Sequence, residues 1–185
     1  QSARCRSKGY VYTRLVKLNM SKIYYVTRKG LSSLAQKQKE LIQDIEKSTR
    51  AMGQSASLDN DLRENPEFMQ LRTRVTYELP KRIANLNDVI RSAKVINDMD
   101  YIQNQDFHEV MPGMEVELKS DDGETRIHSI LGYEEGDPQK GIVSYLSPVG
   151  ERLLHKILGD EVDLPRQGKL IHYEVINIKR SPYLE

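Results

Sequence analysis

The most constraining feature of this sequence is a pair of segments in which mostly apolar residues recur at steps of three and four residues. This spacing places a narrow apolar stripe along one side of an α-helix and is typical of a coiled coil. The first segment follows Thr27, a residue that can cap a helix. Its stripe consists of Leu31, Leu34, Gln38, Leu41, Ile45, Ser48 and Met52. Because the residues between them are mostly charged, this helix requires a single partner.

The second segment supplies that partner. Residues 53–65 (GQSASLDNDLREN) separate the two and are expected to form a turn, because Gly, Ser, Asn and Asp are turn residues. Asn65 and Pro66 should start the second helix, and Pro80 predicts a kink that does not break it. The two helices should therefore form an antiparallel hairpin about 45 Å long at 1.5 Å per residue. The second stripe consists of Phe68, Leu71, Val75, Leu79, Ile83, Leu86, Ile90 and Ala93.

The C-terminal half has a different period. Met114, Val116 and Leu118 alternate with polar residues, which predicts a strand. A small sheet with one helix against it is expected, and the fold class is α+β. The other expected elements are a turn at 120–123, strands at 125–131, 141–145 and 169–178, and a helix at 148–158.

The first 19 residues differ in charge from the rest of the chain. Residues 1–19 contain five basic residues and no acid, so with a formal net charge of +1 the remainder carries 1 − 5 = −4. A mildly acidic body does not suit a protein that grips duplex DNA along its length, because such binding requires phosphate neutralisation. We interpret 1–19 as an extension outside the fold, 20–98 as the hairpin and 99–185 as the sheet domain. The alternative for 1–19 is a basic tail that binds an acidic partner. No apolar run is long enough for a signal peptide or a membrane span, so a cytoplasmic location is expected.

The residues that commonly bind metals are sparse. Cys5 is the single cysteine and lies in the extension, so neither a disulfide nor a thiolate metal site is expected in the fold. None of the histidines has the spacing of a metal ligand. We expect them to be half-buried residues of strands or helices. They are His108, His128, His155 and His172.

The segment between the two helices resembles a known signature. Residues 61–68 (DLRENPEF) are similar to the D-L-x-E-N-x-E-Y motif at the hairpin tip of bacterial Gre factors, the transcript cleavage factors. The run from Ser147-Pro148-Val149 to Gly159-Asp160-Glu161-Val162 is similar to the C-terminal domain of that family. The resemblance covers about residues 23–180 and implies an antiparallel coiled coil followed by an FKBP-like domain.

The resemblance also implies a function. The arm would enter the secondary channel of RNA polymerase, and Asp61 and Glu64 would help to hold a second Mg²⁺ at the polymerase's own active site, without binding an ion alone. The protein would be a monomeric, non-enzymatic cofactor with no membrane partner, and would activate the polymerase's intrinsic RNA cleavage. Arg63, Phe68 and Arg72 would lie near the 3′ end of the nascent RNA. Leu146, Ser147 and Pro148 would dock on the channel rim.

The chemistry is consistent with these residue types. Hydrolysis by two metals requires two ions about 4 Å apart, and Mg²⁺ accepts one or two carboxylates while keeping several waters. Two acids three residues apart on a turn can converge on one ion. The competing interpretation of Asp61 and Glu64 is a capping box, although Asn65 and Pro66 already provide a helix start.

Three other functions stay open. A Gre-like protein could inhibit polymerase without cleavage, because Leu146 replaces a residue that is commonly polar or acidic in the family, and the stretch from Glu64 to Val95 is one residue longer than usual. A peptidyl-prolyl isomerase would follow from the FKBP-like fold, but the sheet domain has Phe107 as its only Phe and no Trp. A coiled-coil adaptor without chemistry would not need the two tip acids.

Overall fold

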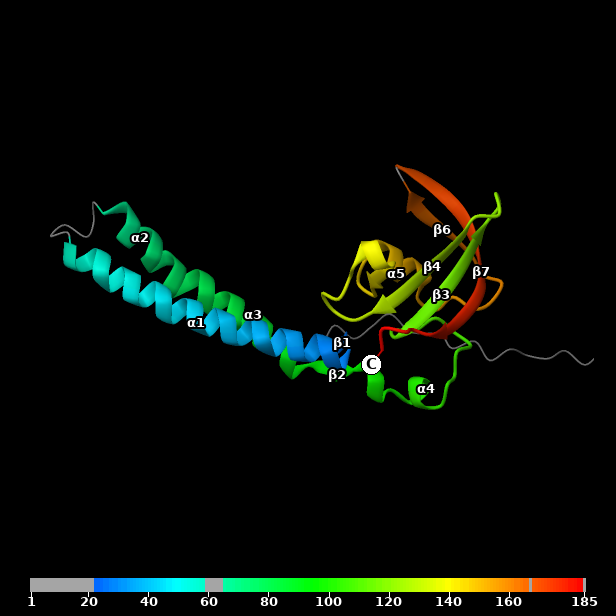
Figure 1. Cartoon of the computed structure of the whole chain (residues 1–185), viewed down its shortest axis with the longest axis horizontal. Helices are drawn as coiled ribbons and strands as arrows, with labels where there is room; N and C mark the ends of the chain where they lie inside the picture. The colour runs from blue at the N-terminus through cyan, green and yellow to red at the C-terminus, as the bar shows by residue number, and fades with distance from the viewer. Residues whose placement is uncertain (1–21, 59–64, 167, 185) are drawn as a thin grey trace, which may run out of the picture.

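The chain folds into a long helical arm attached at its base to a curled β-sheet domain (Figure 1). A computed structural model describes residues 22–58, 65–166 and 168–184. The expected fold class is confirmed: an α+β protein in which an N-terminal antiparallel helical hairpin precedes a sheet domain. Within the described residues, no helix is both long enough and apolar enough to cross a bilayer.

The first arm helix, α1 (Arg28–Leu58), begins where the sequence predicts. Thr27 caps it, because its Oγ1 accepts the Gly30 N–H at 2.9 Å. The predicted start of the turn at Gly53 was wrong, since α1 continues to Leu58, and the rest of that predicted turn, 59–64, lies outside the described residues. Ser55 explains the difference: its side chain is buried against the other helix, and this tertiary contact overrides weak local helix propensity.

The second arm helix runs as α2 (Pro66–Thr73), a π-helical turn η1 (Arg74–Glu78) and α3 (Leu79–Arg91). The predicted cap is confirmed, because Asn65 Oδ1 accepts the Phe68 N–H at 3.0 Å. Pro80 lacks an N–H and its ring crowds the preceding turn. The wider turn of η1 relieves that crowding, and the Leu79 N–H donates to the Arg74 carbonyl five residues back. The helix is therefore irregular here but not interrupted, as the sequence indicates.

A short parallel sheet closes the base of the arm, and the sequence analysis did not predict it. Strand β1 (Tyr24–Val26) pairs with β2 (Ala93–Val95), so the two ends of the hairpin are hydrogen-bonded to each other. Val26 is fully buried and packs with residues of α1 and α3. A 3-10 turn, η2 (Ile96–Asp98), and a short helix, α4 (Asp100–Gln103), then lead to the sheet domain.

The sheet domain contains five strands in the order β5-β4-β3-β7-β6. Only the β4–β5 pair is parallel among these neighbours. The bounds are β3 (Met114–Ser120), β4 (Thr125–Leu131), β5 (Ile142–Ser144), β6 (Glu161–Arg166) and β7 (Lys169–Arg180), with a 3-10 turn η3 (Pro138–Lys140) before β5 and α5 (Pro148–Leu153) after it. All four predicted strands are thereby confirmed as β3, β4, β5 and β7, whereas β6 was not predicted.

The helix predicted at 148–158 was too long. It ends at Leu153, and His155 has a φ of 65°, which lies outside the helical region. The chain turns there because the His155 N–H donates to the Val110 carbonyl at 2.9 Å. His155 and His108 are exposed and outside regular elements, so the expectation of half-buried positions was wrong for both. His128 on β4 and His172 on β7 are half-buried, as expected.

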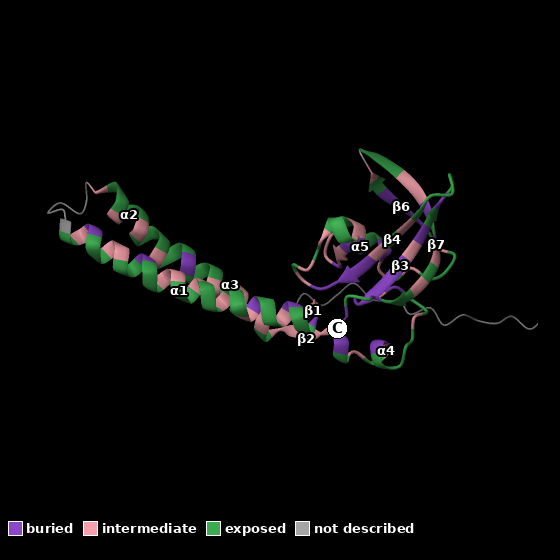
Figure 2. Cartoon of the chain, in the orientation of Figure 1, coloured by how far each residue is buried: buried purple, intermediate pink, exposed green. Residues whose placement is uncertain are grey.

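The main core lies between the sheet and α5, and Figure 2 shows its buried residues concentrated on the strands. Along the arm, by contrast, exposed and partly buried residues alternate with few buried ones, as a narrow two-helix seam requires. The sheet core consists of Val110, Val116, Leu118, Ile130, Tyr145, Leu153, Val162, Leu164, Tyr173 and Val175. The sheet domain thus contains the main buried core, and the thin arm projects from it.

Candidate functional site

The far end of the arm is the first candidate site. The C-terminal end of α1 and the N-terminal end of α2 lie together at the end of the molecule remote from the sheet (Figure 1). The segment that joins them carries the predicted site residues Asp61, Arg63 and Glu64, all three of which lie outside the described residues. The structure therefore describes how the segment is held at its two ends, and the roles of these three side chains stay predictions.

Polar contacts join the two helices next to that segment. Asn65 Nδ2 donates to Ser55 Oγ at 3.2 Å and to the Ser55 carbonyl at 3.5 Å. Ser55 Oγ in turn donates to Glu67 Oε2 at 3.5 Å. Asn65 also caps α2, so one side chain both starts the second helix and ties it to the first. This arrangement limits fraying at the end of a narrow hairpin, where apolar burial is small.

The described tip-proximal residues differ in exposure. Phe68 is half-buried in the first turn of α2, which favours a packing role in the seam. Arg72 is exposed in the last turn of α2 and is accessible to an external phosphate. Arg74 is paired within the arm, because its guanidinium donates to Asp44 Oδ2 at 2.7 Å. This hydrogen bond lowers the pKa of the Asp44 carboxyl. Of the cations near the tip, Arg72 is thus better placed for a partner than Arg74.

The predicted docking residues lie at the start of α5. Ser147 caps the helix: its Oγ accepts the Gly150 N–H at 3.0 Å and donates to the Ser144 carbonyl at 2.7 Å. Leu146 is half-buried and packs against the main core, whereas Pro148 is exposed at the first helical position. Pro148 is therefore the most accessible of the three, while Leu146 and Ser147 also shape the loop that presents it.

The junction between arm and sheet contains residues that sequence analysis missed. Glu135, on the connection between β4 and β5, accepts hydrogen bonds from the Thr27 N–H at 3.1 Å and the Gly132 N–H at 2.8 Å through Oε2. Its Oε1 also accepts from the Thr27 hydroxyl. The partners are 108 positions apart in the chain. No local sequence pattern signals such a contact.

Further contacts support the same junction. The Tyr133 N–H donates to the Tyr25 carbonyl at 2.8 Å, and the Tyr145 hydroxyl accepts the Tyr25 N–H at 3.2 Å. Lys37 on α1 pairs with Glu134 at 2.9 Å, and this hydrogen bond holds the pKa of the Glu134 carboxyl below its ordinary value. The base of the arm is therefore joined to the sheet domain by backbone, side-chain and ionic contacts.

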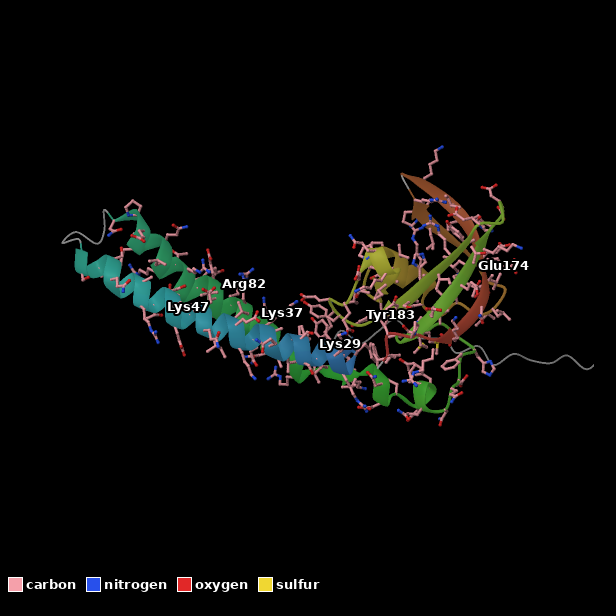
Figure 3. The ribbon with its side chains drawn as sticks, in the orientation of Figure 1. Lys29, Lys37, Lys47, Arg82, Glu174 and Tyr183 are labelled. Atoms are coloured by element: carbon pink, nitrogen blue, oxygen red, sulfur yellow. The ribbon has the colours of Figure 1, made fainter. Side chains whose placement is uncertain are left out.

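A groove follows the arm where it approaches the sheet domain. It has a volume of about 650 Å³ and is lined by charged side chains of both signs together with Leu41, Leu86 and Tyr133. Three of its basic residues, Lys37, Lys47 and Arg82, are spread along the middle of the arm (Figure 3). Since Lys37 is paired with Glu134, the groove offers two cations, Lys47 and Arg82, for which no described acidic partner lies within ion-pair distance.

The part of the chain that the structure describes contains no group of three or more His, Cys, Asp or Glu residues arranged to hold a metal ion. The predicted metal ligands Asp61 and Glu64 fall outside that part. Their donor chemistry fits Mg²⁺, which prefers carboxylate oxygen. Two such side chains leave most of the coordination sphere to other ligands, as a shared ion requires.

Comparison with known proteins identifies similar chains. A family model described as "Transcription elongation factor, GreA/GreB, C-term" matches residues 104–180. The chain is 35% identical over 131 residues to the transcription elongation factor GreB of Haemophilus influenzae, covering 70% of this chain and 79% of that protein. It is 32% identical over 156 residues to GreA of Desulfovibrio desulfuricans, covering 84% of this chain and 88% of that one.

Solved structures were also found. The crystal structure of the GreA factor homolog 1 (Gfh1) protein of Thermus thermophilus aligns with a TM-score of 0.37 and 19% identity, covering 85% of this chain and 99% of that one. The GreA/GreB factor from Nitrosomonas europaea aligns with a TM-score of 0.38 and 20% identity, covering 60% and 88%.

Proposed function

The chain belongs to the GreA/GreB family of transcription elongation factors, and we propose that it inserts its arm into the secondary channel of RNA polymerase and stimulates Mg²⁺-dependent cleavage of backtracked RNA. The supporting observation is the shape of the arm. A hairpin whose first helix has 31 residues projects from a compact sheet domain, and its far end is the site of the motif segment. Such a probe is thin enough to enter a channel and long enough, at about 45 Å, to reach a buried centre.

The tip residues would act by position and charge. Asp61 and Glu64 would place two carboxylates beside the polymerase's own active site, and the Mg²⁺ that they help to hold would stabilise charge on the reacting oxygens. Neither residue needs to bind the ion tightly alone, since the polymerase would supply the other ligands. Accurate placement accounts for a large share of such a rate effect. The Ser55–Asn65 contacts support this mechanism, because they hold the end of α1 and the start of α2 together, on either side of the segment that carries Asp61 and Glu64.

The nascent RNA would be contacted from α2. Arg72 is exposed on α2, so it can approach a phosphate near the RNA 3′ end. Arg63 would contribute in the same way, and the half-buried Phe68 would support the helix from which Arg72 projects. The sheet domain would dock on the channel rim through the loop around Pro148, with Leu146 and Ser147 setting the shape of that loop. The protein would remain a monomer that activates the polymerase's chemistry and would not be an enzyme itself.

RNA length in purified backtracked elongation complexes tests this function. With Mg²⁺ present, addition of the protein should shorten the RNA, and Asp61→Asn or Glu64→Gln should abolish the shortening. Glu46→Gln is the matched control, because Glu46 is an exposed acid on α1 within the arm, and it should leave cleavage intact. If the wild-type protein slows elongation without shortening the RNA, the protein is an inhibitor of polymerase and the cleavage mechanism is rejected.

A further inference from the structure

We propose that Glu134 and Glu135 form a latch that sets the direction of the arm relative to the sheet domain, which makes them positioning residues for the tip. The two acids are consecutive on the connection between β4 and β5, yet their side chains contact α1 at different places. This inference rests on the proposed function, because the direction of the arm matters only if its far end must reach a defined point.

Glu135 determines where the arm begins. Its carboxylate accepts hydrogen bonds from both the N–H and the hydroxyl of Thr27, the residue that caps α1, and from the N–H of Gly132 in its own loop. Thr27 is 3% exposed, so these donors have little access to water and would lose their partners if the carboxylate were removed. An acid at this place is also favoured by the helix dipole. Glu135, a residue of the sheet domain, thus satisfies hydrogen-bond donors at the start of the arm helix.

Two glycines make room for this carboxylate. A Cβ at Gly30 would lie 2.5 Å from Glu135 Cδ, and a Cβ at Gly132 would lie 2.6 Å from the Val26 Cα. Neither glycine has a positive φ, so backbone conformation does not require glycine at either position. At Gly132 the backbone of Val26 leaves no space for a side chain, whereas at Gly30 a side chain would displace the Glu135 carboxylate.

Glu134 acts further along the same helix. It pairs with Lys37 at 2.9 Å, and Lys37 is ten residues beyond Thr27, or about 15 Å along the helix axis. The contacts of Tyr25 and Thr27 with the sheet domain all lie at the start of α1, so by themselves they would leave the helix axis free to tilt about that end. A second attachment at Lys37 restricts the tilt of the axis. The φ of Glu134 is 55°, in the left-handed region that non-glycine residues seldom adopt.

The length of the arm amplifies any change at the base. For an arm of about 45 Å, a tilt of roughly 5° at the base moves the far end by about 4 Å. Displacements of about 1 Å can lower a reaction rate by about a hundred-fold when the displaced groups must meet a reacting centre. The latch would therefore control cleavage without touching the RNA or the ion.

The test measures the arm direction directly and separately from cleavage. Spin labels at Gln54→Cys on α1 and Thr125→Cys on β4, in a Cys5→Ser background, report the distance between arm and sheet domain by pulsed electron resonance in the free protein. Glu135→Ala should broaden that distance distribution by several ångströms and lower the cleavage rate about ten-fold or more. Glu174→Gln, an exposed acid on the side of the sheet remote from the arm (Figure 3), is the control and should change neither quantity.

Exchanging the charges of Lys37 and Glu134 provides a second test that does not depend on the folding of Glu135→Ala. Both Lys37 and Glu134 are largely exposed, so Lys37→Glu and Glu134→Lys should fold, and each alone should broaden the distribution by placing like charges together. The double variant should restore the wild-type distribution and cleavage. An unchanged distribution in Glu135→Ala and in both single exchange variants would overturn the latch, and a broadened distribution with full cleavage would overturn its positioning role. Absence of cleavage by the wild-type protein would reject the proposed function instead, while the distances would still decide whether the latch exists.

Discussion

Leu79→Ala should loosen the arm while leaving the sheet domain intact. Leu79 is 1% exposed at the start of α3, in the part of the second helix that packs along α1. The substitution removes three buried carbon atoms, worth about 2.4 kcal/mol at roughly 0.8 kcal/mol each. The cavity that remains raises the loss to about 3 kcal/mol. Because the described part of the arm seam has few buried residues, such a loss is large relative to the local stability of the hairpin.

Amide hydrogen exchange measures this effect by region. A loss of about 3 kcal/mol raises the open population about 150-fold, so amides of α1 and α3 should exchange faster by about that factor. Amides of β3 and β7 should keep their rates, because their core is separate from the arm seam. Ile42→Ala is the control: Ile42 is 45% exposed on α1, and its truncation should change exchange less than about three-fold.

Equal effects of Leu79→Ala and Ile42→Ala would refute the assignment of Leu79 to the arm seam. Equal acceleration in arm and sheet would instead show that the two parts unfold as one cooperative unit, which contradicts the separate cores inferred here.

Two further predictions concern the sheet domain. In NMR titrations, His172 should have a pKa above 6.5 because it is hydrogen-bonded to Asp163, and His128 should have a pKa below 6.5 because burial disfavours its charged form. The contribution of His172 to stability is therefore present below pH 6.5 and is lost as the pH rises through its folded pKa. His128, by contrast, destabilises the fold as the pH falls below 6.5. pKa values in the opposite order would contradict both assignments. Gly150→Ala should lower the free energy of unfolding in urea by about 1–3 kcal/mol, because the added Cβ would lie 3.0 Å from the Tyr145 Cα. An unchanged urea midpoint would show that the start of α5 can move without cost.

The arm could be predicted from sequence largely because its signals are local. Heptad spacing, the Thr27 cap and the Asn65-Pro66 start each depend on neighbouring residues, and the structure confirms them. The predicted turn at Gly53 was wrong because the contact of Ser55 with the other helix, which local composition does not encode, keeps this segment helical.

The missed elements share a physical cause. Strand β1 has three residues, too few to show a period, and it forms only because β2 lies beside it at the base of the hairpin. Strand β6 contains Pro165, which weakens a strand prediction, but its position at the sheet edge tolerates the missing N–H. The candidate site divides in the same way: the tip acids Asp61 and Glu64 were predicted from a contiguous motif, whereas Glu135 depends on a contact across 108 positions that only the fold creates.

The Mg²⁺ dependence of RNA cleavage tests the central claim most directly. The cleavage rate of a backtracked complex should be measured over a range of Mg²⁺ concentrations with polymerase alone, with the wild-type protein, and with Asp61→Asn. If the arm delivers carboxylates that help to hold an ion, the wild-type protein should lower the half-saturating Mg²⁺ concentration and Asp61→Asn should return it to the value for polymerase alone. Faster cleavage with an unchanged half-saturating concentration, or an equal shift with Asp61→Asn, would contradict the account.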